Sequence, residues 1–332
     1  MKPLMRRLVR HVIRAVDGDA GLSRLESMAV RDTGFGYDRF GCERESFWAG
    51  YLAARQLYRR WFRVRSSGHE HVPPTGRVIL AANHSGLLPF DGAMISTDLV
   101  ERLDPPRALR AIVDHFAFDM PYVGVFMLRT GQVPGTARNF ADLLAEEAAV
   151  LVFPEGTPGF IKPYRERYKL RRFRVGFVEL AIEQEAPIVP VAVVGAEEQA
   201  PVLFSIKALG RPLGLPAFPV TPTFPLLGPL GLIPLPSRYT ILYGEPIWPH
   251  REVSRAAAGD PEALRVIAER VQARVAELIH RGRALRAGEP DPGDASRPAA
   301  NGGATPAATQ ATARGAGASQ PAAPIAAAEV TK

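Results

Sequence analysis

The sequence predicts an α/β fold in which a single mixed sheet is flanked by helices. Through residues 63–285, short apolar runs alternate with helical patterns, an order typical of a sheet with helices on its faces. Residues 1–62 carry basic amphipathic patterns, which predict N-terminal helices at a membrane surface. Residues 286–332 are rich in Ala, Pro and Gly and hold almost no large apolar side chain, so we expect a disordered C-terminal tail there.

The strands are expected where the apolar runs lie, at 78–82, 108–113, 150–153, 188–194 and 239–243. Helical patterns lie between them at 92–102, 137–147 and 174–184. A last amphipathic helix is expected at 261–281, with one stripe formed by Leu264, Ile267, Val271, Val275 and Leu278. In sheets of this kind the chemistry lies in loops at the carboxyl ends of the strands. Candidate catalytic residues are therefore expected in those loops.

The first predicted helix, at residues 1–17, is basic and amphipathic. One side of its helical wheel carries the apolar residues Leu4, Met5, Leu8, Val9, Val12, Ile13 and Val16. The opposite side carries Arg6, Arg7, Arg10, His11 and Arg14. Such a helix either lies among anionic headgroups or packs on the domain with a solvated basic face. A second pattern, at 43–62, interleaves aromatic residues with arginines, which suits a membrane interface.

The composition indicates a basic protein with a full hydrophobic core. The 332 residues are 46% hydrophobic and 23% charged, and the formal net charge is +7. This charge suits nucleic acid, an anionic bilayer, or a small molecule that bears phosphates or CoA. The sequence shows no metal finger, glycine-aromatic ribonucleoprotein block or recognition helix, so nucleic acid is not an expected partner.

Two further features of the sequence bear on the compartment. Residues 1–16 lack the apolar stretch and cleavage site of a secretory signal, and the uncharged stretch 212–237 has too many prolines for a spanning helix. Cys42 is the single cysteine, which excludes a disulfide within the chain and a thiolate metal cluster. We expect a cytoplasmic protein, peripheral on the cytoplasmic face of the membrane.

A histidine and an acid follow the first predicted strand. His84 and Asp91 share one turn in the run from Asn83 to Gly92. If the loop folds back so that Asp91 accepts a hydrogen bond from one ring nitrogen of His84, the other nitrogen is a general base near neutral pH. This pair would deprotonate a hydroxyl group.

The predicted strand at 150–153 also ends in a polar turn, formed by Glu155, Gly156 and Thr157. Glycine lets a ligand approach the backbone, and a carboxylate beside a hydroxyl can hold a polyol. These three residues are therefore candidates for substrate binding.

Together and in this order, the two turns resemble those of the glycerolipid acyltransferase family, which includes the lysophosphatidate acyltransferases. The resemblance covers about 62–246. Further stretches that look like family blocks are 128–133 together with Arg138, then 186–191, and finally 243–247. In the second block of the family an arginine helps to hold the acceptor, which makes Arg129 and Arg138 candidates for acceptor binding.

The resemblance implies an O-acyltransferase of glycerolipid synthesis, with 63–285 as its catalytic domain. It implies direct transfer of a fatty acyl group from acyl-CoA or acyl carrier protein to a lysophospholipid such as lysophosphatidate. His84 would act as the base and Asp91 as its partner, and Glu155, Gly156 and Thr157 would contact substrate. No metal and no cofactor beyond the thioester cosubstrate would be needed.

This sequence departs from the family pattern at two positions. Six residues separate His84 from Asp91 where the family usually has four, so a bulge that contains Pro89 must restore their contact. Members that act on phosphorylated acceptors usually have a basic residue directly after the second turn, where this chain has Pro158. A neutral acceptor, such as a diacylglycerol or a long-chain alcohol, is therefore an alternative.

The basic run after the second turn bears on the same choice. It consists of Lys162, Arg165, Arg167, Lys169, Arg171, Arg172 and Arg174. These side chains either supply charge for a phosphate group or form a solvated face beside a bilayer. The absence of a G-x-S-x-G sequence disfavours a serine hydrolase. Intact His84, Asp91 and Glu155 disfavour a non-catalytic lipid-binding protein.

Overall fold

The fold is known from a computed structural model that describes residues 3–84, 88–160, 162–210, 212 and 214–289. The chain divides into a compact unit, Met1–Asp294, and a second unit, Ala295–Lys332. The second unit lies outside the described residues, as does nearly all of the tail predicted at 286–332.

A seven-stranded mixed sheet forms the centre of the compact unit, in the order β1-β9-β6-β2-β5-β3-β4. Every neighbouring pair is parallel except β6 and β9, which run antiparallel. The strands are β1 (Arg65–Ser67), β2 (Val78–Ala82), β3 (Leu109–Val113), β4 (Val133–Pro134), β5 (Ala149–Val152), β6 (Ile188–Val194) and β9 (Thr240–Tyr243). The α/β class and the mixed sheet predicted from the sequence are confirmed. A small antiparallel sheet is added by β7 (Phe204–Ile206) and β8 (Phe218–Val220).

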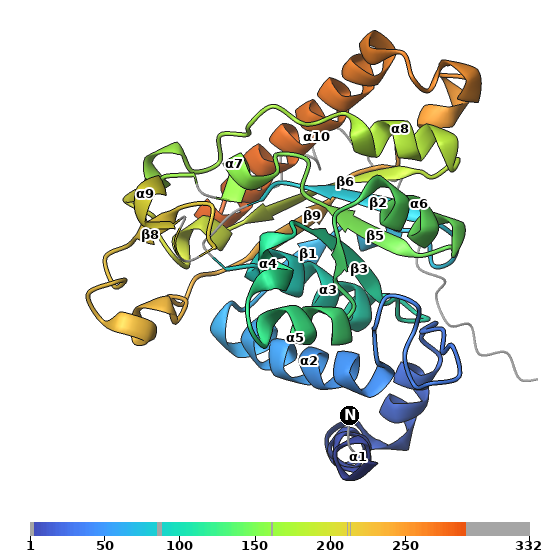
Figure 1. The fold of residues 1–332 in the computed structure, drawn as a ribbon, viewed down its shortest axis with the longest axis vertical. Coiled ribbons are helices and arrows are strands. Elements are labelled where there is room, and N and C mark those ends of the chain that lie inside the picture. The colour runs from blue at the N-terminus through green and yellow to red at the C-terminus, as the bar shows by residue number, and fades with distance from the viewer. Residues whose placement is uncertain (1–2, 85–87, 161, 211, 213, 290–332) are drawn as a thin grey trace, which may run out of the picture. The chain divides into compact units, whose positions relative to one another are not determined.

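Helices cover both faces of the sheet (Figure 1). One face packs against α6 (Ala137–Ala145), α8 (Gly176–Glu183) and α10 (Pro261–Ala287), and the other against α3 (Phe90–Arg102). The uninterrupted apolar sequence of strand β2 follows from burial on both faces of the sheet. Ile79 points to the first face and Leu80 to the second, and both side chains are fully buried. The loop that follows β2 and carries His84 is thus attached to a fully buried strand.

Two helices precede the sheet, α1 (Pro3–Glu26) and α2 (Arg44–Gln56), and a π-helical turn, Leu57–Trp61, extends α2. Ile13 of α1 is fully buried in a cluster with Trp48 of α2. On the side expected to be basic, Arg6 bonds to Glu43 at 2.8 Å. The exposed apolar side chains of α1 are Leu4, Met5, Leu8, Val12 and Val16. The helix therefore packs on the domain and also leaves an apolar strip open to solvent.

The lone cysteine belongs to the same N-terminal core. Cys42 is fully buried, and burial raises the pKa of its thiol to about 11. A protonated, buried thiol is a poor nucleophile.

Short helices lie in the connections that follow β3, β5 and β7. They are α4 (Phe116–Asp119), α5 (Val123–Arg129), α7 (Thr157–Phe160) and α9 (Lys207–Gly210). Across the described part of the chain, no helix combines the length and apolar character needed to cross a bilayer.

Candidate active site

The end of β2 is locked by a side chain that continues the sheet. The buried Asn83 amide donates to the Val193 carbonyl at 3.0 Å, and its Oδ1 accepts from the Val193 N–H at 2.8 Å. These bonds mimic one more step of the ladder between β2 and β6. They fix the backbone from which His84 emerges.

His84 and Asp91 are in contact. The Nδ1 atom of His84 lies 2.7 Å from Oδ2 of Asp91, whose side chain is fully buried. Pro89 directly precedes α3, so Asp91 sits in the first turn of that helix, where the helix dipole favours a carboxylate. The helix start thus brings the acid back to the histidine despite the longer spacing. Residues 85–87 of this turn lie outside the described residues.

The imidazole is held on its face as well as at its edge. The ring of His84 stacks on Phe153, with centroids 4.1 Å apart and planes 19° apart. The His84 side chain keeps 15% of its surface exposed, while Asp91 keeps none. A ring fixed by a buried acid and an aromatic face, yet reachable from solvent, has the geometry of a general base.

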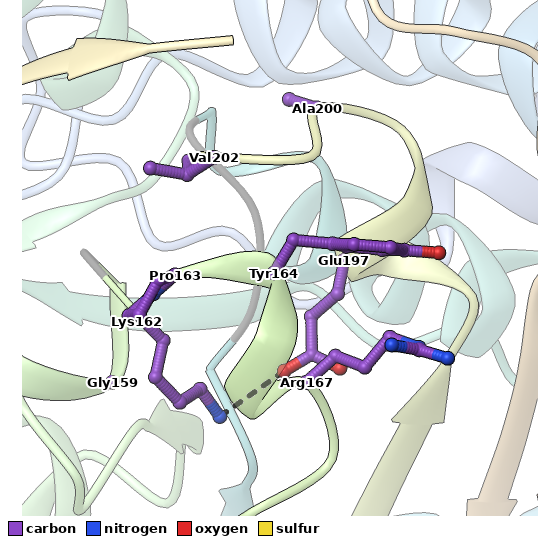
Figure 2. A pocket seen from close by; sticks show the side chains of 8 residues that line it. All are labelled: Gly159, Lys162, Pro163, Tyr164, Arg167, Glu197, Ala200 and Val202. Atoms are coloured by element: carbon purple, nitrogen blue, oxygen red, sulfur yellow. Dashed lines mark ion pairs between the residues drawn. The ribbon is translucent and has the colours of Figure 1, made fainter. Parts of the chain in front are cut away.

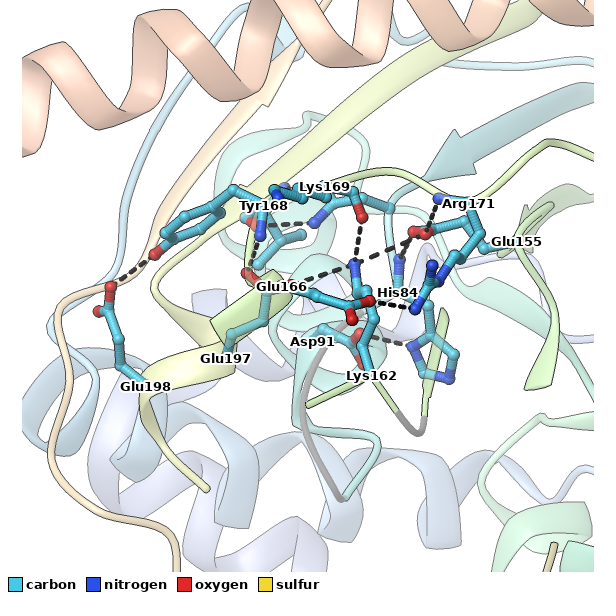
Figure 3. Close-up of polar contacts among 12 residues, drawn as sticks. His84, Asp91, Glu155, Lys162, Glu166, Tyr168, Lys169, Arg171, Glu197 and Glu198 are labelled. Atoms are coloured by element: carbon cyan, nitrogen blue, oxygen red, sulfur yellow. Dashed lines mark hydrogen bonds and ion pairs between the residues drawn. The ribbon is translucent and has the colours of Figure 1, made fainter. Parts of the chain in front are cut away.

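Glu155 connects the second turn to the first (Figure 3). Its Oε1 accepts a hydrogen bond from the His84 backbone N–H at 3.0 Å, and its Oε2 accepts from the Arg171 N–H at 2.7 Å. The Glu155 side chain has no exposed surface. The sequence predicts that this carboxylate contacts substrate, whereas the structure shows both of its oxygens bonded to the protein's own backbone.

A buried cation neutralises this carboxylate. Nζ of Lys162 lies 3.5 Å from Oε2 of Glu155 and 3.1 Å from Oε1 of Glu197, and the Lys162 side chain is only 3% exposed. Burial raises the pKa of Glu197, and Lys162 only partly opposes that effect. Lys162 belongs to the basic run considered for phosphate binding, but its charge is engaged inside the protein.

A pocket opens beside this cluster (Figure 2). Its lining consists of Gly159, Lys162, Pro163, Tyr164, Arg167, Glu197, Ala200 and Val202. Lys162 and Glu197 pair with each other there, and the guanidinium of Arg167 lies 4.6 Å from the centre of the Tyr164 ring. Arg167 is thus the cation that this pocket presents to solvent.

Gly156 and Thr157 are held by contacts with Arg174, Phe153 and Asp114. Gly156 has a left-handed φ of 62°, and a Cβ there would lie 3.0 Å from Cζ of Arg174. Its N–H donates to the Phe153 carbonyl at 2.9 Å, so this N–H is already used within the turn. The Thr157 hydroxyl donates to Asp114, at the end of β3, at 3.0 Å. Arg174 thus places an exposed guanidinium against Gly156 of the Glu-Gly-Thr turn, in addition to the buried Lys162.

The two arginines predicted to hold the acceptor contact residues outside both turns. The guanidinium of Arg129 stacks over Tyr37, 4.4 Å from the ring centre. Arg138 lies on α6 with 88% of its side chain exposed and has Asp142 as an ion-pair partner at 3.9 Å. Their predicted role in acceptor binding stays a prediction.

Several residues that shape the site carried no sequence signal. Asn83, Phe153 and Glu197 act through contacts with residues that are distant in sequence. The sequence does not distinguish Lys162 from the other members of the basic run. Among the described residues, His, Cys, Asp and Glu side chains nowhere gather in a group of three suited to a metal ion.

Comparison with known proteins identifies the class. Residues 63–194 match the family model Acyltransferase. The chain is 41% identical over 228 residues to an uncharacterised protein of Mycobacterium leprae, which covers 68% of this chain and 62% of that protein. The chain thus spans about three fifths of the length of this relative.

Two further similarities involve lipid acyltransferases. A 1-acyl-sn-glycerol-3-phosphate acyltransferase of Chlamydomonas reinhardtii is 27% identical over 152 residues, 42% of this chain and 41% of that protein. The crystal structure of the 1-acyl-sn-glycerophosphate acyltransferase of Thermotoga maritima has a TM-score of 0.47 and 20% identity, over 83% of this chain and 95% of that chain.

The matched segment contains the His84 turn and the Glu155 turn, and it defines an acyltransferase domain. Residues 63–194 therefore form an acyltransferase domain, and this match together with the Chlamydomonas relative supports the resemblance to glycerolipid acyltransferases seen in the sequence.

Proposed function

We propose that this protein transfers a fatty acyl group from an acyl thioester to the hydroxyl of a lysophospholipid such as lysophosphatidate, in glycerolipid synthesis. The thioester is carried by CoA or by acyl carrier protein. The observation that carries the proposal is the 2.7 Å contact between His84 Nδ1 and Asp91 Oδ2 inside the acyltransferase domain. The similarity to the 1-acyl-sn-glycerol-3-phosphate acyltransferase of Chlamydomonas reinhardtii supports a glycerol phosphate ester as the acceptor.

His84 acts as the general base of the transfer. Asp91 accepts from Nδ1–H and so makes Nε2 the basic ring nitrogen. Nε2 takes the proton of the acceptor hydroxyl, and the oxygen attacks the carbonyl carbon of the thioester. The C–S bond then breaks, and the imidazolium returns the proton to the leaving thiolate. The buried carboxylate of Asp91 offsets the imidazolium charge between these two steps.

Arg174 supports a phosphorylated acceptor. The Arg174 N–H donates to the Pro154 carbonyl at 3.0 Å, which holds this residue beside the Glu-Gly-Thr turn. Its exposed guanidinium lies against Gly156. A guanidinium binds phosphate through paired hydrogen bonds, so Arg174 supplies the charge that Pro158 lacks.

The second candidate is transfer to a neutral acceptor, a diacylglycerol or a long-chain alcohol. Pro158 favours it, because family members with phosphorylated acceptors usually carry a basic residue at this position. The two candidates differ in the role of Arg174. A neutral acceptor has no phosphate group that this guanidinium could bind.

Labelled acyl-CoA offered with both acceptors decides between the candidates. We expect label in phosphatidate, and we expect Arg174→Gln to raise KM for lysophosphatidate by about tenfold with a small change in kcat. Arg172→Gln, an exposed neighbour, is the matched control. Label in neutral lipid with none in phosphatidate would favour the second candidate. Absence of transfer to any acceptor would leave the non-catalytic, lipid-binding alternative.

The proposal places the protein on the cytoplasmic face of the membrane, with α1 as one contact. Leu4 and Leu8 of α1 are 79% and 51% exposed. Deleting the helix would also uncover the core around Ile13, so Leu4→Asp combined with Leu8→Asp is the sharper test. We expect this variant to sediment less with anionic vesicles at every salt concentration. Unchanged sedimentation would exclude α1 as the anchor.

A further inference from the structure

The loop between β8 and β9, residues 221–237, has a composition that the acyl-transfer chemistry does not explain. It contains no charged side chain. Its exposed large apolar residues include Leu226 at 83%, Leu227 at 54%, Leu230 at 69% and Ile233 at 55%. A single exposed leucine is ordinary on a protein surface, but several within one loop mark a site of interaction.

The loop has an ordered internal structure. The Leu227 N–H donates to the Thr223 carbonyl at 2.8 Å, and the Thr223 hydroxyl donates to the Gly231 carbonyl at 3.0 Å. A Cβ at Gly231 would lie only 2.3 Å from the Thr223 carbonyl oxygen, so this close approach requires glycine. The chain closes on itself through its backbone. It therefore holds its leucines outward instead of folding them into the core.

One buried residue joins this loop to the active-site turn. The backbone carbonyl of Gln199 accepts from the Leu235 N–H at 2.7 Å. The side-chain amide of Gln199 donates to the carbonyl of Leu88, which lies between His84 and Asp91, at 3.3 Å. Gln199 is 1% exposed. The apolar loop is thus attached to the catalytic turn and not to a remote part of the surface.

Basic and amphipathic side chains border the loop. The indole N–H of Trp61, a side chain that is 39% exposed, donates to the Pro234 carbonyl at 3.0 Å. Arg60 and Arg63 are exposed on either side of Trp61 in the sequence, and Arg238 is exposed directly after the loop. Tryptophan with arginines around an apolar centre matches the headgroup and acyl layers of an anionic bilayer.

We propose that the β8–β9 loop inserts its leucines into an anionic bilayer and seats the active-site turn at the lipid surface. The proposal rests on the proposed function, because a lysophospholipid acceptor reaches His84 from that surface. The bilayer matches both parts of the pattern. Its acyl layer receives the leucines, and its anionic headgroups receive the arginines. The contact is distinct from α1 and lies next to the chemistry.

The test uses the full chain with Leu226→Asp and Leu230→Asp combined. The matched control is Val266→Asp, on α10, where the side chain is 61% exposed. The probe is a vesicle of phosphatidylcholine and phosphatidylglycerol. We expect the double variant to partition onto these vesicles at least about tenfold less than the wild type, since each inserted leucine is worth more than a factor of ten. The control should partition normally.

Turnover is then measured with long-chain lysophosphatidate in these vesicles and with a short-chain, monomeric lysophosphatidate. We expect the double variant to lose turnover on vesicles and to keep it on the monomeric acceptor. Vesicle partition equal to that of the wild type would overturn the proposal. A wild-type dimer that the double variant splits would also overturn it and would identify the loop as a contact between copies. If the wild type transfers to no acceptor, the proposed function fails, while the partition measurement still decides the role of the loop.

Discussion

The turns after β2 and β5 lie at the same edge of the sheet and each carries an acid, but the two acids are placed differently. Asp91 bonds to an imidazole that solvent can reach. Glu155 bonds to two backbone N–H groups and lies near a buried lysine. One carboxylate therefore bonds to the ring of the proposed base, and the other bonds to the backbone of the loop that carries this ring. Both carboxylates follow a strand end, so their roles differ because their hydrogen-bond partners differ.

The second turn is held by a buried cluster of charges. Glu155, Lys162 and Glu197 form a buried group of two negative charges and one positive charge. Such a group is costly to desolvate and costly to break. Its benefit here is positional, since it fixes the backbone N–H of His84.

The largest expected effect is the loss of turnover when His84 is replaced. His84→Ala should lower turnover by about 10²–10⁴-fold, roughly 3–5 kcal/mol of barrier, because it removes the positioned base. The free energy of unfolding should change little. Steady-state transfer of labelled acyl groups and urea unfolding measure the two quantities. The matched control is His115→Ala, an exposed histidine at the start of α4, which should keep normal turnover. Equal losses in both variants would contradict the role of His84.

On the structural side, Lys162→Met should lower the free energy of unfolding by about 3–5 kcal/mol, because it leaves Glu155 and Glu197 without their cation. The measurement is chemical unfolding at neutral pH. Lys169→Met, at an exposed position of the same basic run, is the control and should be nearly neutral. If the two variants are equally stable, the buried group does not hold the turn.

A smaller effect concerns pH. Burial raises the pKa of Glu197, so the folded state holds this proton at pH values where the unfolded state has lost it. Stability should therefore fall as the pH rises from the ordinary glutamate pKa through the raised one, and then level off. Glu197→Gln should lose this slope because an amide does not titrate. Its carbonyl oxygen can still accept the hydrogen bond from the Tyr168 N–H, so the local structure should be kept. Unfolding across a pH series measures both proteins. Identical slopes would assign the pH dependence to other groups.

Much of the fold was predictable because burial leaves a pattern in the sequence. Strand β2 is covered on both faces, so it reads as a continuous apolar run. Strands β1 and β4 were missed because segments of two or three residues give no period. Helix α10 was predicted too short because its apolar stripe is interrupted at Gly282, where a glycine occupies the buried position that follows Leu278 on the stripe. Arg286 bonds to Glu198 in the last turn, and the helix ends at the left-handed Gly288.

The site was predictable only where its residues are close in sequence. His84 and Asp91 share one turn, so their contact followed from a local argument. The buried position of Lys162 depends on its ion pair with Glu197, which follows β6. No local sequence pattern predicts a contact between residues so far apart in the chain. Arg174 likewise returns to Gly156 only because the chain between them folds over the turn. Composition identified the basic run, but only the fold shows which of its charges faces inward.

The most direct test of the central claim is to replace each acid by its amide and measure turnover and stability together. Asp91→Asn should lower turnover by about 10²–10⁴-fold with nearly unchanged thermal stability, because it removes charge and favours the wrong imidazole tautomer. Glu155→Gln should lower the free energy of unfolding by about 1.5–3 kcal/mol, and the protein that remains folded should keep more of its turnover than Asp91→Asn does. Near wild-type turnover in Asp91→Asn would contradict the account. So would a Glu155→Gln variant of normal stability whose KM rises for the acceptor, since Glu155 would then contact substrate.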